Sequence, residues 1–424
     1  MKFLSRLVLL TGLLLAGCAN PFDSELDDLK TVRQVKAVCR DLLHFKLDKK
    51  PHCEASSPAT CVNGIKLPKQ CLQIAKAEEL LSTPEIRIAY VQSSSPISEL
   101  SHILDGIFFA ANRVNESGGI YGRPLQIDVI QDSVHVIESF TKTISVKVAE
   151  NLDTVAVFGN YESEEALPSS ITYEREGLLF LSAYAGNSAL TNHRFRMTFS
   201  TTPNNDNQAE DLVHYAVSQN WRRIAIFFTV PEMNNPAEKF EATTVRYKLP
   251  IVIKKAIFPG KLDYRDDVAD LTKKHVDGIL VAAKGKDARN LISAISKFKI
   301  TQPILGFRYL ASKDTRGDNN LVSLGTVLAP VLEFDVPTVL KGMAGFQEKY
   351  GYTPDLWAAR GYDNLMLLAD AIKKTKATSP EAIANTLRYL DQPWVGLVGA
   401  YQFDENGTLK SQNYQIVDIK TFFN

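Results

Sequence analysis

The most informative hydrophobic pattern in the chain is that of a strand, a helix and a second strand. Residues 86–91 form a short apolar run with β-branched side chains, which is typical of a buried strand. Apolar residues then recur every three or four positions between 97 and 114, so one face of a helix is predicted to pack on a sheet. Gly118 and Gly119 end this helix, and residues 125–130 alternate as a second strand does. Because parallel strands joined by a helix need a right-handed crossover, the pattern predicts one βαβ unit of an open α/β sheet.

Strand and helix patterns continue to alternate along the rest of the chain. In a first group, strands are predicted at 86–91, 125–130, 154–158 and 178–182. In a second group, they are predicted at 223–228, 251–257, 276–282 and 303–307. Thr201, Thr202 and Pro203 lie between the two groups and are predicted to form a hinge. The alternation indicates an α/β fold in which mainly parallel sheets are flanked by helices.

Several ordered segments resemble a known family. They are ANRVNESGGIYGRPLQIDVIQD at 111–132, AVFGNYES at 156–163, ITYEREGLLFLSAYAGNSALT at 171–191, VDGILVAA at 276–283 and GAYQFDENGTLK at 399–410. In this order they resemble the leucine/isoleucine/valine-binding branch of the type I periplasmic binding proteins, over roughly residues 85 to 420. The resemblance implies two lobes, lobe 1 from 85–202 and 333–396 and lobe 2 from 203–332 and 397–424. The chain would return to lobe 1 near Pro330 and cross a third time near residues 396–399.

The first residues have the layout of an export signal. Lys2 and Arg6 precede an apolar run at 7–15, which is too short to span a bilayer. Residues 15–18, LAGC, resemble the bacterial lipobox, which implies a signal peptide at 1–17 and a lipid on Cys18. Ala19 follows the cysteine, which by the sorting rule of such signals implies the periplasmic face of the outer membrane rather than the inner membrane. The alternative is a plain signal peptide with a cysteine by chance.

The remaining four cysteines lie in residues 18–84, ahead of the α/β region: Cys39, Cys53, Cys61 and Cys71. An even number in an exported segment predicts two disulfides, with three possible pairings. We favour Cys39 with Cys71, enclosing Cys53 with Cys61, because helices are predicted around 29–43 and 72–81 with a loop between them. So small a helical extension needs covalent support. A zinc site is the alternative, but no CxxC pair and no nearby His pair is present.

Composition and missing motifs exclude several functions. The 424 residues carry 48 basic and 48 acidic side chains, so charge does not predict a nucleic acid as partner. The chain contains no GxSxG, no HExxH, no Walker phosphate loop and no GxGxxG that opens a helix. We therefore expect no enzyme, no cofactor and no metal.

Candidate ligand-binding residues follow the predicted strands, because open α/β sheets bind ligands outside the carboxyl ends of their strands. In lobe 1 they are Ser94, Ser163, Ser182, Tyr184 and Gly186; in lobe 2 they are Lys284 and Arg308. The resemblance implies that Ser163 starts a helix and holds a ligand carboxylate, although a simple helix cap explains it equally well. The two lobes carry opposite charge at their strand ends, with acidic residues in lobe 1 and basic residues in lobe 2: Glu162, Glu164 and Glu165 against Lys284, Lys286 and Arg308. This pattern suggests either salt bridges across the cleft or ordinary solvated charge.

Two positions depart from the family's amino-acid binders. Those proteins have a hydroxyl residue at the position of Gly186 and an acidic residue at the position of Arg308, which together neutralise a ligand ammonium. Glycine has no side chain to offer, and arginine has the opposite charge. We therefore expect branched-chain amino acids to bind weakly or not at all.

The resemblance implies a lipid-anchored protein that captures a small solute between two lobes for ABC-type import. The alternative is an envelope lipoprotein that uses the same fold to bind a protein partner, as penicillin-binding-protein activators do. In both cases the membrane is reached through the lipid anchor alone.

Overall fold

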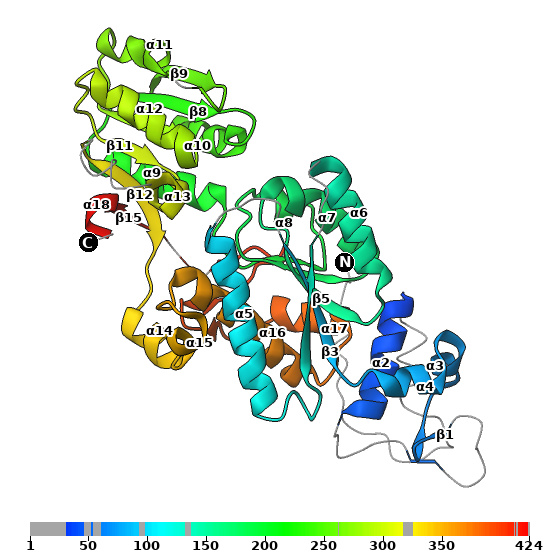
Figure 1. Cartoon of the computed structure of the whole chain (residues 1–424). Helices are drawn as coiled ribbons and strands as arrows, with labels where there is room; N and C mark the ends of the chain where they lie inside the picture. The colour runs from blue at the N-terminus through cyan, green and yellow to red at the C-terminus, as the bar shows by residue number, and fades with distance from the viewer. Residues whose placement is uncertain are drawn as a thin grey trace.

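The computed structural model describes residues 31–45, 52–53, 61–92, 98–131, 137–261, 263–316, 325–410, 412 and 414–422. Two sheets organise the chain (Figure 1). Cys18 and Ser94, two of the predicted functional residues, lie outside the described residues.

The first sheet has five parallel strands in the order β4-β3-β5-β6-β7. Their bounds are β3 (Ile86–Val91), β4 (Leu125–Ile130), β5 (Thr154–Gly159), β6 (Leu179–Ser182) and β7 (Thr198–Ser200). All residues of β5 and β6 are buried, as expected of central strands covered on both faces. The covering helices are α5 (Ser98–Glu116), α6 (Ile137–Glu150), α7 (Ser163–Arg175), α8 (Ala189–Asn192), α16 (Leu356–Thr375) and α17 (Pro380–Arg388).

Helices α5 and α16 pack closely through a pair of glycines. A Cβ on Gly106 would lie 1.9 Å from the carbonyl oxygen of Ala358, and a Cβ on Gly361 would lie 2.0 Å from that of Ile103. Each helix therefore needs a residue without a side chain where it faces the other backbone. The contact brings α5, which follows the first strand of lobe 1, against α16, which lies more than 200 residues later. Both segments of the chain that form lobe 1 are thereby packed together.

The second sheet has six strands in the order β15-β12-β11-β10-β8-β9. Their bounds are β8 (Ile224–Thr229), β9 (Ile251–Ile257), β10 (Gly278–Ala282), β11 (Ile304–Gly306), β12 (Val327–Leu332) and β15 (Tyr414–Asp418). Only β15 runs antiparallel to its neighbour. Its helices are α9 (Asn205–Ser218), α10 (Asn234–Arg246), α11 (Arg265–Val268), η2 (Ala269–Thr272), α12 (Gly285–Lys297), η3 (Arg308–Ala311), α13 (Lys313–Arg316) and α18 (Ile419–Phe422).

The structure confirms all eight predicted strands to within two residues at each end, and adds β7, β12 and β15. Strand β12 has the sequence VLAPVL, and Pro330 inside it pairs with Ile416 of β15. Proline has no N–H to donate to a ladder, which makes such a strand hard to recognise from the sequence. The return to lobe 1 is predicted near Pro330, two residues before this strand ends. The return follows Leu332, through α14 (Val336–Gly342) and α15 (Phe346–Tyr350).

The predicted third crossing near residues 396–399 is wrong. There the chain forms a hairpin of β13 (Trp394–Val395) and β14 (Ala400–Tyr401) and stays against lobe 1. Thr408 bridges to Ser200 of β7, and the ring of Phe403 lies 5.1 Å from that of Phe199. The chain reaches the second sheet only with β15, because the apolar side chains that follow the hairpin are buried against the first lobe.

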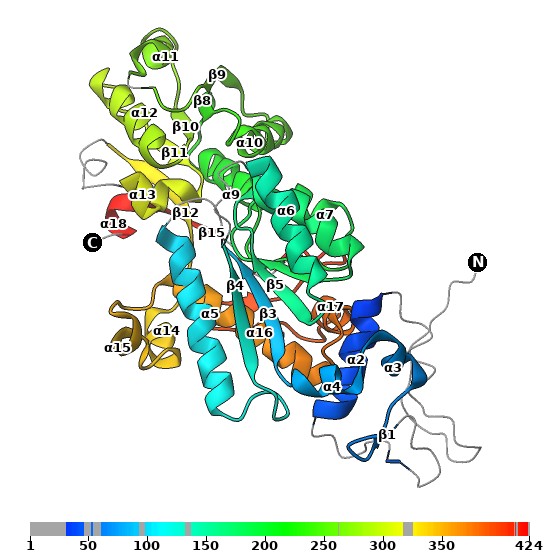
Figure 2. The ribbon, with the colours of Figure 1, turned by 45° about the vertical axis from the view of Figure 1, so that its right-hand side comes forward.

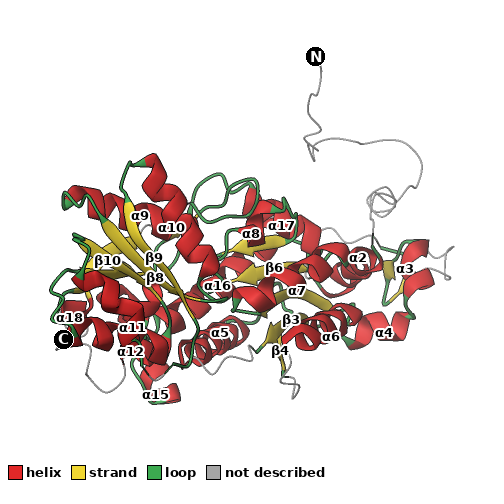
Figure 3. Cartoon of the chain, turned by 90° about the horizontal axis from the view of Figure 1, so that it is seen from above, coloured by secondary structure: helices red, strands yellow, loops and turns green. Residues whose placement is uncertain are grey.

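The N-terminal extension contains both predicted disulfides, Cys39–Cys71 and Cys53–Cys61. Helix α2 (Val32–His44) agrees with the prediction, but the second predicted helix is two short ones, α3 (Lys69–Ile74) and α4 (Ala77–Ser82). The intervening loop includes a small hairpin of β1 (Cys61–Val62) and β2 (Ile65–Lys66). Figures 2 and 3 show the extension at the end of lobe 1 that is remote from lobe 2.

Candidate functional site

The candidate site lies where the carboxyl ends of the strands of both lobes approach each other. Tyr184 and Gly186 follow β6, Lys284 follows β10, and Arg308 follows β11 at the start of η3. Parallel strands end at one edge of a sheet, so residues distant in sequence meet there. Ser163 begins α7 directly after β5.

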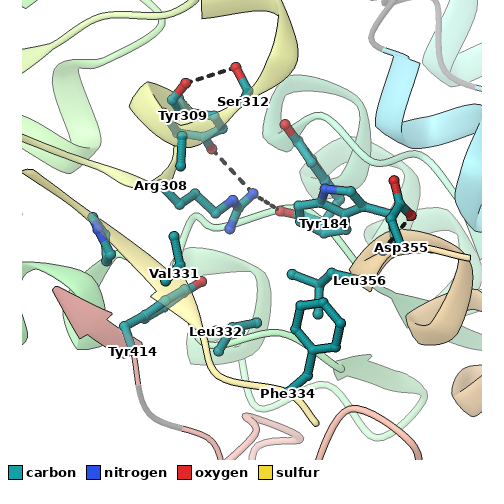
Figure 4. A pocket seen from close by; sticks show the side chains of 13 residues that line it. Tyr184, Arg308, Tyr309, Ser312, Val331, Leu332, Phe334, Asp355, Leu356 and Tyr414 are labelled. Atoms are coloured by element: carbon teal, nitrogen blue, oxygen red, sulfur yellow. Dashed lines mark hydrogen bonds between the residues drawn. The ribbon is translucent and has the colours of Figure 1, made fainter. Parts of the chain in front are cut away.

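A cavity of about 180 Å³ lies between the lobes. Lobe 1 contributes Tyr184 and the start of α16, whereas lobe 2 contributes η3, β12 and β15. Most of the wall is aromatic or aliphatic, with few polar groups (Figure 4). The lining residues are Tyr184, Arg308, Tyr309, Ala311, Ser312, Pro330, Val331, Leu332, Phe334, Asp355, Leu356, Trp357 and Tyr414.

Arg308 is the cation of this cavity. Its side chain lies between the rings of Tyr184 and Tyr309, with the guanidinium carbon 4.5 and 4.9 Å from the two ring centres. Nη2 donates to the carbonyl oxygen of Tyr184 and, at 3.5 Å, to the hydroxyl of Tyr309. Nε and Nη1 are buried without a hydrogen-bond partner among the described residues. Burial lowers the pKa of Arg308, but the neighbouring tyrosines outweigh it and raise the pKa, so the group stays charged.

Gly186 and Arg308 face each other across the cleft. A Cβ on Gly186 would lie 2.6 Å from Oδ1 of Asn205 and 3.5 Å from Nη1 of Arg308. The two positions at which the sequence departs from the amino-acid binders are therefore neighbours in space. The space that a hydroxyl side chain would need is taken by Asn205 of α9.

Lys284 and Glu162 form a salt bridge from lobe to lobe, with Nζ 3.0 Å from Oε2. The ammonium also lies 4.7 Å from the ring centre of Tyr309. Burial lowers the pKa of Lys284, but the attraction of Tyr309 and Glu162 outweighs it and raises the pKa. Of the two interpretations of this charge pattern, the salt bridge across the cleft is the one that the structure contains.

Ser163 and Ser182, two of the predicted ligand-binding residues, lie outside the cavity wall. The Ser163 hydroxyl accepts a hydrogen bond from the backbone N–H of Asn187 at 3.3 Å. Ser182 is the last residue of β6 and fully buried. Neither residue lines the cavity, and neither do Gly186 and Lys284. Of the described residues predicted for ligand binding, Tyr184 and Arg308 alone contribute to its wall.

Sequence reasoning missed most of the wall. Leu332 and Phe334 lie where the chain leaves β12, and Tyr414 begins β15; neither of these strands was predicted. A local signal existed for Asp355, since an acidic residue before an apolar run predicts a helix N-terminus. The carboxylate of Asp355 does cap α16, but the pattern says nothing of the cavity beside it.

No group of three or more His, Cys, Asp and Glu side chains in the described parts of the chain could hold a metal ion. Within those parts, no helix is both long enough and apolar enough to cross a membrane.

Comparison with known proteins agrees with this architecture. A family model described as periplasmic binding protein matches residues 85–422, four-fifths of the chain. The chain belongs to the periplasmic binding protein family. This periplasmic binding protein is 22% identical over 324 residues to a Leu/Ile/Val-binding protein homologue of Brucella abortus. The aligned region covers 74% of this chain and 84% of the relative.

Two solved structures illustrate the range of ligands among its structural neighbours. An ABC transporter substrate-binding protein of Desulfitobacterium hafniense, in complex with Leu, has a TM-score of 0.67 and 25% identity, covering 78% of this chain and 96% of that one. A solute-binding protein of R. palustris, in complex with benzoate, has a TM-score of 0.65 and 14% identity, covering 79% and 93%. Both share with this periplasmic binding protein a fold of parallel sheets flanked by helices.

Proposed function

We propose that this periplasmic binding protein captures one small solute between its lobes and presents it to an ABC-type importer. The observation that carries the proposal is the cavity whose wall comes from both lobes. A site divided in this way is completed only when the lobes approach, so binding and closure are coupled. The neighbours' complexes with Leu and with benzoate support a small organic ligand.

The size and lining of the cavity favour a small ligand over a protein segment. A volume of about 180 Å³ is below the roughly 300 Å³ at which drug-sized sites begin, yet exceeds the roughly 150 Å³ that admits benzene. A single solute of fewer than about a dozen heavy atoms fits these limits. We also propose that the mature chain starts at a lipidated Cys18 and faces the periplasm from the outer membrane.

Mass spectrometry of the protein purified from its own cells tests both proposals. Under native conditions we expect a mass excess that corresponds to one retained small molecule and disappears on denaturation. Under denaturing conditions we expect a chain that begins at Cys18 and carries acyl groups. Should no small molecule be retained, and a solute library cause no thermal shift, solute capture is wrong. Co-purification of one envelope protein in fixed stoichiometry would then favour the alternative function.

A further inference from the structure

We propose that the cavity takes a small monocarboxylate with an aliphatic or aromatic body and no ammonium group, and that Arg308 binds its carboxylate. This inference rests on the proposed solute capture and names the chemical class of the solute. It follows from three features of the cavity: an unpaired cation, the absence of a free acidic partner, and an apolar wall.

The unpaired cation is Arg308. Its exposed fraction is only 7%, and the side chains that act on its pKa are tyrosines rather than acidic residues. Nε and Nη1 have no hydrogen-bond partner in the described parts of the chain. A buried charge without a counter-charge is unfavourable, and a carboxylate can accept a charge-assisted hydrogen bond from one of these free N–H groups. The site is therefore complementary to a small anion.

Among the described residues of the wall, the one acidic side chain already has partners and is poorly placed to receive an ammonium group. Asp355 is the acidic residue of the wall, and its two oxygens are already engaged. Oδ1 accepts from the backbone N–H groups of Trp357 and Ala358, both at 3.0 Å, and Oδ2 lies 2.7 Å from Nδ1 of His102. An ammonium near Arg308 would also face like charge, which disfavours a zwitterionic amino acid.

The rest of the wall accepts an apolar body. Phe334, Trp357 and Leu332 present rings and methyl groups to the cavity. Apolar atoms buried there gain hydrophobic free energy. Benzoate and 4-methylpentanoate, which is leucine without its ammonium group, match both the volume and this division into a charged and an apolar end.

Calorimetric titration of ligand-free protein with a matched ligand series tests the inference. The series is 4-methylpentanoate, the neutral 4-methylpentanamide, leucine, and benzoate. We expect both carboxylates to bind, and 4-methylpentanoate to bind roughly 10- to 100-fold more tightly than the amide and leucine, as charge-assisted hydrogen bonds predict. Leucine or the amide binding as tightly as 4-methylpentanoate would overturn the inference but leave solute capture standing. The inference is equally wrong if neither carboxylate binds, whereas solute capture fails only if mass spectrometry and the solute library also find no ligand.

Substitutions at Arg308 provide a second, independent measurement. Arg308→Met keeps an extended side chain without charge, and should reduce carboxylate affinity to that of the amide. Arg308→Lys keeps the charge but loses the directed N–H groups of the guanidinium, and should give an intermediate affinity. The control is Lys286→Met, which removes an exposed cation from the first turn of α12, outside the cavity, and should bind as the wild type does. Wild-type carboxylate affinity in a folded Arg308→Met protein would refute the assignment. If that variant does not fold, the wild-type ligand series decides.

Discussion

At the scale of single residues, Asp363 shows how one buried carboxylate organises a loop. It lies on α16, and its oxygens accept from the backbone N–H groups of Leu397 and Val398, at 2.8 and 2.9 Å, and from the hydroxyl of Tyr401 at 3.2 Å. These bonds hold the β13–β14 hairpin against lobe 1. Burial nevertheless raises the pKa of Asp363 from 3.8 to about 6, although the same hydrogen bonds lower it.

This pKa predicts a pH dependence of stability. Between pH 3.8 and about 6 the native carboxyl holds a proton that the unfolded chain has lost, so the contribution of Asp363 falls as pH rises. At about 1.4 kcal/mol per pKa unit, the loss across the window is about 3 kcal/mol. Urea unfolding of wild type and Asp363→Asn from pH 4 to pH 6 should show their difference in unfolding free energy changing in this direction. Asp391→Asn, at an exposed carboxylate with a lowered pKa, should show no such change in the window. A pH-independent difference for Asp363→Asn would contradict the assignment.

At the scale of secondary-structure elements, helix α2 fastens the Cys-rich extension to lobe 1. Arg33 is buried and donates through Nη1 to the carbonyl oxygens of Asn151 and Thr154, both at 2.8 Å. Nη2 donates to Ala149 at the end of α6, and burial lowers the pKa of Arg33 to about 10. The extension is therefore joined to the amino-terminal edge of the first sheet, away from the cavity.

We predict that Arg33→Met loosens the extension without altering ligand binding. The substitution removes the hydrogen bonds of the buried guanidinium to these carbonyl groups, which costs about 1 to 3 kcal/mol. Limited proteolysis should cut the extension of the variant sooner than that of wild type, while the two lobes stay resistant. Arg175→Met serves as the control, because its side chain is 67% exposed and forms a surface pair with its neighbour Glu176. If both variants are cut at the wild-type rate, Arg33 does not hold the extension in place.

At the scale of the whole molecule, the lobes are joined directly across the cleft. The salt bridge of Lys284 with Glu162 and the hydrogen bond of Arg308 to Tyr184 both connect lobe 2 to lobe 1. The first pair is largely shielded, with side-chain exposed fractions of 21% and 14%. These contacts favour the closed arrangement of the lobes in the ligand-free protein, and the binding free energy of a ligand would add to them.

We predict that Glu162→Gln shifts the ligand-free protein toward an open arrangement. Loss of about 1 kcal/mol from this pair would change the ratio of open to closed molecules roughly fivefold. Small-angle X-ray scattering should then give a larger radius of gyration for the variant, and a saturating ligand should restore the wild-type value. Lys286→Met, which removes an exposed cation from the first turn of α12, should scatter as the wild type does. An unchanged radius for Glu162→Gln would show that the salt bridge does not hold the lobes together.

The sequence by itself determined the parts of this protein that depend on local pattern. Short apolar runs and alternating hydrophobicity located eight strands, and cysteine spacing together with flanking helices led to the correct disulfide pairing. The difference from the amino-acid binders at Gly186 and Arg308 was also visible in the sequence, because it depends only on which residues stand at these positions. The structure adds that these two residues face each other.

The tertiary structure alone decided the third crossing and most of the cavity wall. Strand β15 pairs with β12 only after the chain has passed twice through lobe 1, so no local pattern fixes it there. Phe334, Trp357 and Tyr414 read as ordinary apolar or aromatic positions, and they form one wall because segments distant in sequence converge. The physical reason is that hydrophobic periodicity reports which face of an element is buried, whereas the partner on which it is buried depends on how the whole chain returns.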